Sequence, residues 1–533
     1  MNIGLYHGYE LIGSGSNEYN RYLARELANN KHTIHILCRE PNPEKFDFIS
    51  DAYCWDINGN QTILFEDRND SNCTLHQLPN ASVKPVYVTD KQREGNVKTF
   101  SNLTDDELAE YHALNHNILL KILTKYQLDI LHCNHLVYQP IAAMNACIET
   151  QTPYMIFLHG SAIEYTVKDD ERYQKLALEA IIKCNGIISG NKEVRNRIIK
   201  LYPDYKDMIL AKTEIVGMGV DTQLFQSVAK QNRNASIQQL LKYDGIFGKK
   251  RYQSDELKTE LSLGNIQATR NYWNNYNHSV PDNGFAQKLK SIPWSENIIL
   301  FVGALTAGKG LQSVISSLPA ILKEKKNIHL VIVGAGAYRE VLEAMVYAIS
   351  VGDKALFLEL CKHGIDLDRG DYLGAWQDVL DYIHIEDKLN ELFLYGSKVD
   401  KHVHFLGRLD HDLLQYLFPC ADIGIFPSVV PEAYGLVLME SLSNGVFPIV
   451  SYFSGFVDGV DELETYLGKE IVTHMKIDMQ SEKRIQSIIS NVLSVLHNLK
   501  QKPLAHKLRP IAVDNYDWKI RAKQMEKAYK CFL

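Results

Sequence analysis

Short apolar runs alternate with amphipathic stretches near the start of the chain. "NIGLYH" (2–7) and "HTIHILC" (32–38) are strand candidates, and between them "SNEYNRYLARELANN" (16–30) places apolar residues at helical spacing. The same alternation returns at "DILHCN" (129–134), "YMIFLHG" (154–160) and "GIISGN" (186–191), each followed by a helix-like segment. Repeated βαβ units predict a mostly parallel sheet with helices on both faces.

A second series of the same kind begins after residue 295. Its strand candidates are "NIILFVG" (297–303), "IHLVIVG" (328–334), "HVHFLG" (402–407), "DIGIFPS" (422–428) and "FPIVSYF" (447–453). A length of 533 residues exceeds one ordinary core, since domains hold roughly 150 residues each. The pattern therefore predicts two doubly wound α/β domains, 1–220 and 295–514.

Three segments interrupt this pattern. Residues 221–294 are polar and predict a linker or insertion rather than a core, and residues 345–400 predict a helical insertion into the second domain. Residues 40–105 interrupt the first domain and are predicted to form polar loops.

Composition narrows the class of protein. The net charge of -7, from 57 basic and 64 acidic residues, argues against a nucleic-acid-coating protein and against a nucleic-acid partner. Nine scattered cysteines without a C-x-x-C pair predict reduced thiols. The chain start lacks the features of a signal peptide, and no run reaches the ~20 apolar residues of a membrane span. We expect a cytoplasmic protein without a transmembrane segment, with peripheral membrane contact left open.

The stretch "PEAYGLVLME" (431–440) is the first candidate site. It follows the strand in "DIGIFPS", so it lies beyond the carboxyl end of that strand, where open α/β sheets bind ligands. A helix is expected from near Gly435 to about Asn444, with Gly445 as its stop. Its first amides would attract an anion, and Glu432 and Glu440 could accept hydrogen bonds from hydroxyl groups. The alternative is a first-turn glutamate that complements the helix dipole and a second one on plain surface.

Three further elements carry candidate chemistry. Lys309 in "VGALTAGKG" (302–310) could reach a phosphate, although the loop does not match the Walker A pattern. Gly13 and Gly15 allow a close backbone approach at a helix start, or simply a tight turn. His159 ends a strand, and a lone histidine is often structural.

Taken together, these elements resemble glycosyltransferase family 4, the retaining nucleotide-sugar transferases. The carriers are the E-x7-E block in "FPSVVPEAYGLVLMESLSNG", the preceding "VHFLGRLDHDLLQYLFPCAD", the loop "VGALTAGKG", the connection "GMGVDTQLF" (217–225) and the C-terminal "DNYDWKIRAKQMEKAYKCFL". The resemblance excludes residues 40–105, 230–292 and 345–400. It implies the GT-B fold, in which two Rossmann-like domains face each other across a cleft. The first domain, completed by a helix at about 515–533, would bind the acceptor, and the second would bind the donor.

The resemblance also implies roles for individual residues. Lys309 would pair with the donor diphosphate, Glu432 would contact hydroxyls of the transferred sugar, and His159 would lie beside that sugar. Glu440 would hold the ribose, and the backbone at Arg408 would hold the base. The implied donor-binding set is Gly15, Gly303, Arg408, Leu409, Tyr434, Gly435, Leu436, Val437 and Glu440.

The implied function is retaining transfer of a hexose from a nucleoside-diphosphate sugar, UDP-sugar before GDP-mannose, to an acceptor hydroxyl. The acceptor stays open among sugars, glycans, lipid-linked and small hydroxyl compounds. A front-face mechanism without cofactor or metal is expected. The D-x-D-like pairs at 366–368 and 410–412 are predicted to be helix caps or solvated surface.

One departure from the family leaves alternatives open. Ala304 stands where the family usually has a phosphate-binding arginine, and Lys91 or Arg93 could replace that charge or read an acidic acceptor. A weak or non-catalytic nucleotide-sugar binding protein is one alternative. A sugar phosphorylase, a nucleotide-sugar hydrolase or an epimerase on the same fold is another.

Overall fold

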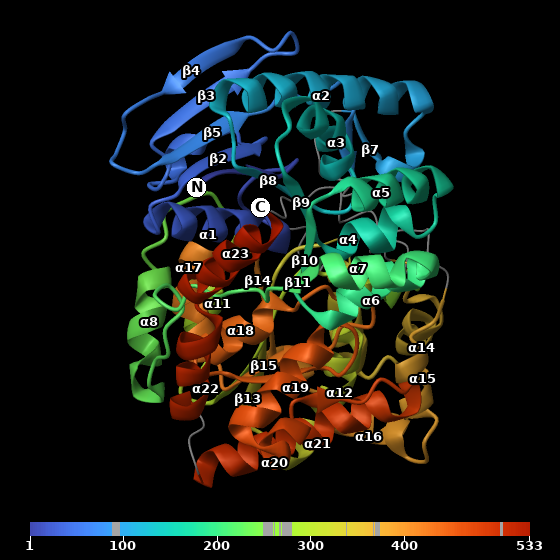
Figure 1. Ribbon diagram of the computed structural model, residues 1–533. Coiled ribbons are helices and arrows are strands. Elements are labelled where there is room, and N and C mark those ends of the chain that lie inside the picture. Colours follow the sequence, from blue (N-terminus) through green and yellow to red (C-terminus); the bar gives the residue numbers. More distant parts are fainter. Residues whose placement is uncertain are drawn as a thin grey trace. The chain divides into compact units, whose positions relative to one another are not determined.

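The computed structural model (Figure 1) describes residues 1–87, 96–248, 259–260, 262–265, 268, 280–336, 338–365, 367, 374–501 and 505–533. The chain divides into two units, Met1–Gly219 with Tyr516–Leu533, and Val220–Asn515. Each unit is described by itself. No helix within the described ranges is both long and apolar enough to cross a bilayer.

The first unit is built on a nine-stranded sheet in the order β11-β10-β9-β8-β1-β2-β5-β3-β4. All neighbouring strands are parallel except β3 and β4. The strands are β1 (Asn2–Tyr6), β2 (Thr33–Cys38), β3 (Asp51–Trp55), β4 (Gln61–Phe65), β5 (Cys73–Gln77), β8 (Ile130–Asn134), β9 (Tyr154–Leu158), β10 (Gly186–Ser189) and β11 (Thr213–Ile215). A separate pair joins β6 (Lys84–Val86) to β7 (Val97–Thr99). The strand order reverses between β1 and β8, which makes this point the ligand-binding edge expected of doubly wound sheets.

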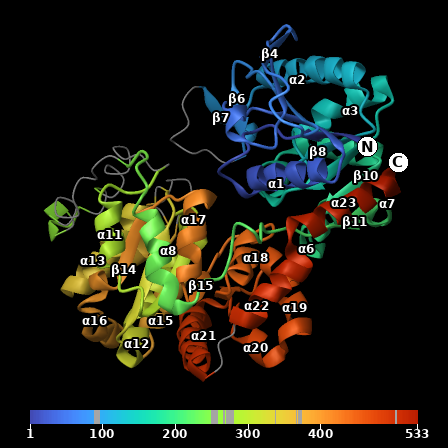
Figure 2. The same ribbon diagram turned by 90° about the vertical axis from the view of Figure 1, so that its left-hand side faces the viewer.

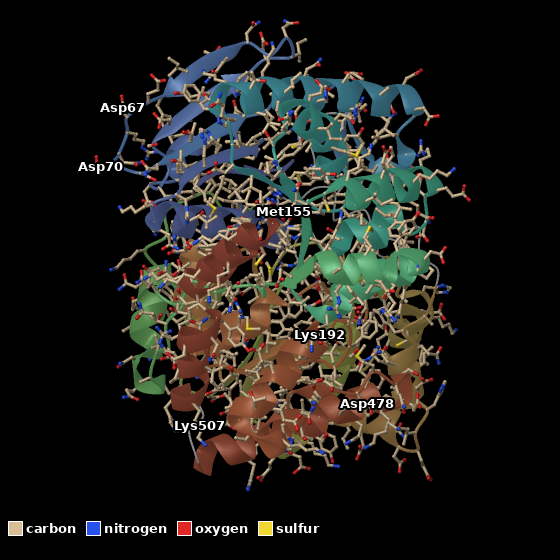
Figure 3. All side chains as sticks on the ribbon, in the orientation of Figure 1. Asp67, Asp70, Met155, Lys192, Asp478 and Lys507 are labelled. Carbon is tan, nitrogen blue, oxygen red and sulfur yellow. The ribbon has the colours of Figure 1, made fainter. Side chains whose placement is uncertain are left out.

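Helices pack on this sheet and bury its apolar strands. They are α1 (Gly15–Asn29), α2 (Asp105–Tyr126), α3 (Gln139–Thr150), α4 (Gly160–Ala162), α5 (Glu171–Lys183), α6 (Lys192–Leu201), α7 (Lys206–Lys212) and α23 (Trp518–Phe532). The C-terminal helix α23 packs on α1, although about 490 positions separate them in sequence. Met155 on β9 is fully buried, whereas Asp67 and Asp70, beyond β4, are exposed (Figure 3).

The prediction that residues 40–105 form polar loops is wrong. Strands β3 and β5 join the main sheet, with β5 paired to β2 and β3 paired to β5. Each is only five residues long and mixes polar residues with buried ones such as Cys73 and Leu75. So short a run gives a weak period-2 signal, and the neighbouring strand decides its conformation.

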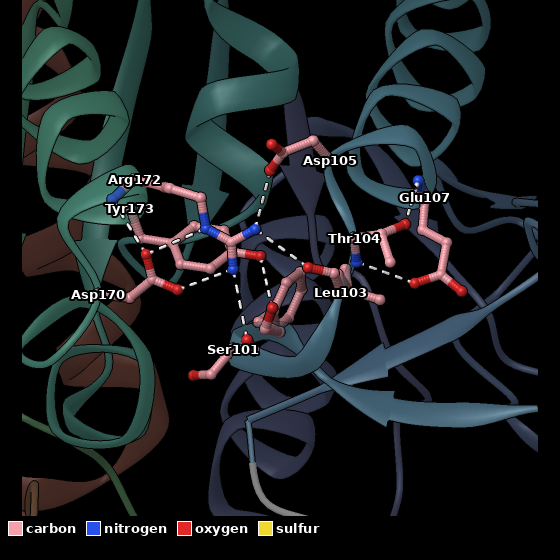
Figure 4. Close-up of polar contacts among 9 residues, drawn as sticks. Ser101, Leu103, Thr104, Asp105, Glu107, Asp170, Arg172 and Tyr173 are labelled. Atoms are coloured by element: carbon pink, nitrogen blue, oxygen red, sulfur yellow. Dashed lines mark hydrogen bonds and ion pairs between the residues drawn. The ribbon is translucent and has the colours of Figure 1, made fainter.

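The end of this segment is fastened to α5 by polar contacts (Figure 4). Arg172 Nη1 donates to the carbonyl of Leu103 at 3.0 Å and to Asp105 Oδ1 at 2.9 Å. The Tyr173 hydroxyl donates to the carbonyl of Phe100 at 2.7 Å. These bonds satisfy loop carbonyls that no sheet ladder uses.

The second unit holds a six-stranded parallel sheet in the order β14-β13-β12-β15-β16-β17, which is the Rossmann order. Its strands are β12 (Asn297–Val302), β13 (Ile328–Val333), β14 (Val403–Gly407), β15 (Ile423–Phe426), β16 (Phe447–Ser451) and β17 (Lys476–Ile477). The strand order reverses between β12 and β15. The apolar runs that predict strands in both halves of the chain are all strands, and the expected α/β class is confirmed.

Helices also cover the second sheet, as Figure 2 shows. They are α8 (Arg233–Leu240), α11 (Phe285–Ser291), α12 (Leu311–Glu324), α13 (Arg339–Val351), α14 (Lys354–His363), α15 (Gln377–Ile383), α16 (Lys388–Gly396), α17 (His411–Leu417), α18 (Leu436–Ser443), α19 (Gly455–Leu467), α20 (Lys469–Thr473), α21 (Ser481–Gln501) and α22 (Ala505–Ile511). Helices α13 to α16 occupy most of the segment 345–400, for which the sequence predicts a helical insertion.

The sequence predicts a linker or an insertion at 221–294, and the described parts of this segment are built into the second unit. Arg233 on α8 donates to both carboxylate oxygens of Asp422, at 3.0 and 2.8 Å. Arg339, with none of its surface exposed, donates to both oxygens of Asp282, at 2.7 and 2.6 Å, and Asp282 is 1% exposed. The polar composition of this segment does not reveal that it packs on the second unit, because Arg233 and Asp282 pair with residues far away in the sequence.

Candidate functional site

Two loops meet at the carboxyl edge of the second sheet, where β12 and β15 diverge. The loop after β12 forms the single turn η6 (Ala307–Lys309) and then Gly310, which has φ of +70°. A β-carbon on Gly310 would lie 2.1 Å from the carbonyl oxygen of Pro427, at the end of β15. The amide of Val429 donates to the carbonyl of Gly308 at 2.8 Å. Only glycine therefore fits this close approach of the two loops.

An ion pair joins the same loops. Lys309 Nζ contacts Glu432 Oε1, and the two side chains are 28% and 21% exposed. The carbonyl of Glu432 accepts from the Ser454 hydroxyl at 2.9 Å and from the amide of Gly455 at 3.1 Å. The structure thus brings together two residues, Lys309 and Glu432, to which the family resemblance gives donor-binding roles. The loop that carries Glu432 is also bonded to the start of α19.

Helix α18 begins and ends where the sequence predicts. Gly435 precedes it with φ of +63°, and Gly445 follows with φ of +70°. The amide of Leu438 donates back to the carbonyl of Gly435 at 2.9 Å. The amides of Leu436 and Val437 precede the first full turn, so the helix offers them no acceptor. Glu432 precedes these amides by a few residues in the sequence, and its ion pair brings Lys309 to the same loop. The partial positive charge of the amides favours an anion.

Glu440 lies about one turn further along α18 than Leu436 and is only 8% exposed. Its carboxylate lies 3.3 Å from His411 Nε2, at the start of α17. The His411 ring packs edge-on against Phe225, with centroids 5.1 Å apart. Sequence reasoning missed His411, and the only available signal was its place directly after the helix cap Asp410.

The loop after β14 carries Arg408 and Leu409, which the family resemblance places at the base. The amide of Arg408 donates to the carbonyl of Val280 at 3.2 Å, and the amide of Asp282 donates to the carbonyl of Leu406 at 2.9 Å. The Arg408 backbone amide, in the segment that the resemblance places at the base, is therefore already hydrogen-bonded to Val280. Leu409 is buried. Gly303, at the end of β12, donates to the carbonyl of Val333 on β13 at 3.0 Å.

Two predicted site residues belong to the first unit. Gly15 is the first residue of α1 and is exposed, after the N-cap Ser14. His159 follows β9 and is 5% exposed. Burial is the main reason that the pKa of His159 lies well below the usual histidine value, and His7 and His132 lower it further. His159 is therefore neutral at physiological pH.

Sequence reasoning missed a cluster of histidines around His159. His7 follows β1 and His135 follows β8, and their rings stack with centroids 5.6 Å apart. The rings of His135 and His159 are 4.5 Å apart. Burial also lowers the pKa of His7, to about 4. The three rings come from three neighbouring strands, so their proximity becomes visible only once the strand order is known.

Several other expectations concern charge and metal. Asp410 caps α17 by accepting from the amide of Leu413 at 3.1 Å. Asp366, Asp368, Lys91 and Arg93 lie outside the described residues. Within the described ranges, no group of three or more histidine, cysteine or carboxylate side chains could hold a metal. Ala304 is exposed in the loop after β12, and contributes no charge there.

Residues 285–364 and 389–502 match the family model described as glycosyl transferases group 1. The second unit carries a glycosyltransferase group 1 domain. The domain includes Lys309, Arg408, Glu432 and Glu440, so the geometry above belongs to it. Its match identifies the domain as that of a transferase enzyme.

Two curated relatives match parts of the chain. An uncharacterized glycosyltransferase of Methanocaldococcus jannaschii is 28% identical over 163 residues, which is 31% of this chain and 29% of the relative. The lipopolysaccharide 1,2-N-acetylglucosaminetransferase of Salmonella typhimurium is 21% identical over 250 residues, 47% of this chain and 52% of the relative. The matches thus span less than a third and about half of these relatives.

Solved structures extend the likeness from the group 1 domain to the whole chain. Anabaena HepE in complex with UDP and glucose superposes with a TM-score of 0.54, at 12% identity, over 99% of each chain. At that identity the likeness shows the fold alone. The chain has the GT-B fold, with two Rossmann-like units.

Proposed function

We propose that the chain is a retaining glycosyltransferase of family 4. It moves a hexose from a nucleoside-diphosphate sugar to an acceptor hydroxyl. The observation that carries the proposal is the ion pair of Lys309 with Glu432, where β12 and β15 diverge. A cation suited to a diphosphate and a carboxylate suited to sugar hydroxyls stand together there, at the start of α18.

Glu440 extends this site along α18. Its nearly buried carboxylate can accept two hydrogen bonds from vicinal hydroxyls such as those of a ribose. The anion-favouring amides of Leu436 and Val437 lie one turn before it on the same helix. A ligand with a diphosphate between a ribose and a hexose matches this order of groups.

The reaction breaks the anomeric C–O bond while negative charge grows on the departing diphosphate. In the proposal, Lys309 and the start of α18 stabilise that charge, which is the largest single contribution in many enzymes. The acceptor attacks from the face of the leaving group, and the diphosphate takes the acceptor's proton. His159 positions the sugar through a hydrogen bond. No metal or cofactor enters this scheme.

A UDP-sugar is the proposed donor, with GDP-mannose next. Support comes from Anabaena HepE, which has been solved in complex with UDP and glucose. The acceptor class stays open among sugars, glycans, lipid-linked and small hydroxyl compounds. The Salmonella relative, by its name, transfers N-acetylglucosamine to lipopolysaccharide, so both N-acetylglucosamine and glucose belong in a donor screen.

A second candidate is a nucleotide-sugar binding protein with little or no turnover. It is favoured by Ala304, since removing one cation from a diphosphate clamp weakens leaving-group stabilisation by about 3–4 kcal/mol if nothing replaces it. This candidate predicts donor binding without product, whether or not an acceptor is present.

The first test is thermal stability in the presence of UDP, GDP and ADP and of their glucose, mannose and N-acetylglucosamine forms. A specific ligand at 100-fold over its dissociation constant adds about 2.7 kcal/mol. We expect a shift with one nucleotide family, reduced in Glu440→Ala. The matched control Glu470→Ala removes an exposed carboxylate on α20 and should respond like the wild type. No shift with any nucleotide would contradict the proposal.

Product analysis then separates the two candidates. The preferred donor is incubated with and without a mixture of sugar and lipid-linked acceptors, and released nucleotide and glycosylated product are counted. Glycosylated product with the retained anomeric configuration supports the transferase. Tight donor binding without product supports the binding protein, and sugar phosphate or epimerised donor would support the remaining enzymes of this fold.

A further inference from the structure

A chain of hydrogen-bonded amides leads from α1 to His159. It begins at Asn20, whose side-chain Nδ2 donates to the carbonyl of Ser16 at 2.8 Å. A backbone carbonyl only accepts, so it fixes the Asn20 amide with its nitrogen toward Ser16. Asn20 Oδ1 is then the atom that faces the next residue in the chain, and it also can only accept.

Asn134, the last residue of β8, is the hydrogen-bond partner of this fixed Asn20 oxygen. Its Nδ2 donates to Asn20 Oδ1 at 2.7 Å and to the carbonyl of Tyr6 at 3.3 Å. Both partners are oxygens that can only accept. If the Asn134 amide were turned over, its own oxygen would face the Asn20 and Tyr6 oxygens, and no hydrogen bond could form. Two independent contacts therefore hold the amide in one orientation. The side chains of Asn20, Asn134 and His159 are all buried, so water could not satisfy the groups that such a mismatch would leave unpaired.

The fixed amide presents its oxygen to His159. Asn134 Oδ1 lies 2.9 Å from His159 Nε2 and can only accept, so Nε2 must carry a hydrogen. A neutral imidazole has one N–H, and His159 is neutral for the reasons given above. Its Nδ1 is then a bare lone pair.

The same nitrogen is the open side of the ring. Among the described residues, the polar atoms that are sealed from solvent without a partner include both ring nitrogens of His135, but not Nδ1 of His159. Within the part of the chain that the structure describes, the hydrogen bond of His159 is made through Nε2. The acceptor nitrogen of His159 therefore keeps some contact with solvent, although the residue is only 5% exposed.

We propose that Asn134 is a positioning residue that locks His159 with its hydrogen on Nε2, so that Nδ1 accepts a hydrogen bond from a hydroxyl group of the bound sugar. This inference deepens the proposed function and rests on it for the identity of the sugar. The Nδ1 lone pair repels the oxygens of a diphosphate, whereas it can accept a hydrogen bond from an O–H group. His159 would thus contact a hydroxyl group of the hexose rather than the leaving diphosphate.

The loop after β1 repeats the device. Asn17 Nδ2 donates to the carbonyl of Ile12 at 2.7 Å, which fixes that amide, and Asn17 Oδ1 lies 2.9 Å from His7 Nε2. Two histidines, which follow the strands on either side of β8, are thus held in the same tautomer by asparagines. A single coincidence of side-chain packing would not produce the arrangement twice.

The test is solid-state NMR of the sedimented full-length protein labelled with 15N-histidine, at neutral pH and without added ligand. A His159→Gln spectrum assigns the two ring nitrogens of His159 by difference. We expect Nε2 to be protonated and Nδ1 to be unprotonated. A protonated Nδ1, or an equal mixture of tautomers, would overturn the proposal, whatever reaction the protein performs.

Two asparagine variants test which asparagine fixes which histidine. Asn134→Leu should release His159 into a mixture of tautomers and leave His7 unchanged, whereas Asn17→Leu should do the reverse. A His159 tautomer that survives Asn134→Leu would remove Asn134 from its proposed role. If a variant fails to fold, the wild-type spectrum still decides the tautomer.

Ligand addition tests the hydroxyl contact separately. The Nδ1 signal of His159 should shift when the preferred sugar nucleotide saturates the protein, and it should stay in place with the nucleoside diphosphate alone. An equal shift with the sugar nucleotide and with the nucleoside diphosphate would contradict the contact between Nδ1 and a sugar hydroxyl. Absence of any nucleotide binding in the stability assay would instead sink the proposed function and leave the tautomer measurement intact.

Discussion

Replacing Gly435 by alanine should damage both the stability of the second unit and its nucleotide binding. Gly435 stands directly before α18, with φ of +63°. A β-carbon there would lie 2.0 Å from Cε1 of Phe456, which is 2% exposed on α19. The ring is packed and cannot swing away cheaply, so the start of α18 must move instead.

The magnitude follows from two terms. The left-handed backbone costs an alanine about 1–2 kcal/mol relative to glycine. Overpacking against the buried Phe456 ring adds about 1–3 kcal/mol. Gly352 provides the matched control, because its φ is +79° and a β-carbon there would meet nothing within 4 Å. Gly352→Ala should therefore show the backbone term alone.

Urea unfolding and calorimetric titration with UDP measure the two consequences. Gly435→Ala should lose about 1–3 kcal/mol more than Gly352→Ala, which is the overpacking term by itself. It should also bind UDP more weakly, because the amides of Leu436 and Val437 shift with the helix start. Gly352→Ala should bind UDP like the wild type. Equal stabilities for the two variants, together with unchanged UDP binding, would refute the argument that Gly435 sets the position of α18.

Four further outcomes are expected. Glu440→Gln should weaken UDP binding about tenfold, since a hydrogen bond to a charged group contributes about 1.5–3 kcal/mol, and titration with 2′,3′-dideoxy-UDP should not distinguish the two proteins. Lys309→Met should weaken binding of UDP but not of uridine, as measured by calorimetry at low salt. Asp282→Asn should destabilise the second unit by about 3 kcal/mol in urea unfolding, because it removes the carboxylate that both Nη atoms of the fully buried Arg339 contact, while the contact of Arg339 Nε with Glu343 stays. The first unit should lose stability as the pH falls from 6.5 to about 4, by up to 1.4 kcal/mol per pH unit for His7, since the unfolded chain binds a proton that the folded chain excludes. His7→Gln should reduce that loss by the share of His7, while the other buried histidines of the unit, such as His35, keep theirs.

Sequence pattern was sufficient where the structure depends on local regularity. The long apolar runs predicted the main strands of both units, and the glycines around "LVLMESLS" predicted both ends of α18. It failed for β3 and β5, which are too short to show a period and form because β2 offers a paired edge. Local pattern describes neighbours along the chain, and these strands are specified by neighbours in space.

The candidate site divides in the same way. Glu432, Glu440 and Lys309 were visible because their spacing to glycines and strand ends is local. The bond from the Arg408 amide to Val280 could not be predicted, because it joins residues 128 positions apart. The tautomer of His159 was equally hidden, since it depends on Asn20 and on the way that β1 and β8 pair.

The ion pair of Lys309 with Glu432 also bears on the alanine at position 304. The pair has no net charge, so Lys309 is available to a diphosphate only when its contact with Glu432 opens. In the proposed function, Lys309 then turns to the phosphate and frees the Glu432 carboxylate for the sugar hydroxyls, so one event prepares both residues. A family arginine at 304 would supply a cation that needs no such exchange. With Ala304, donor binding and release of Glu432 become a single coupled step, and the exchange draws on the electrostatic energy that would otherwise go into affinity.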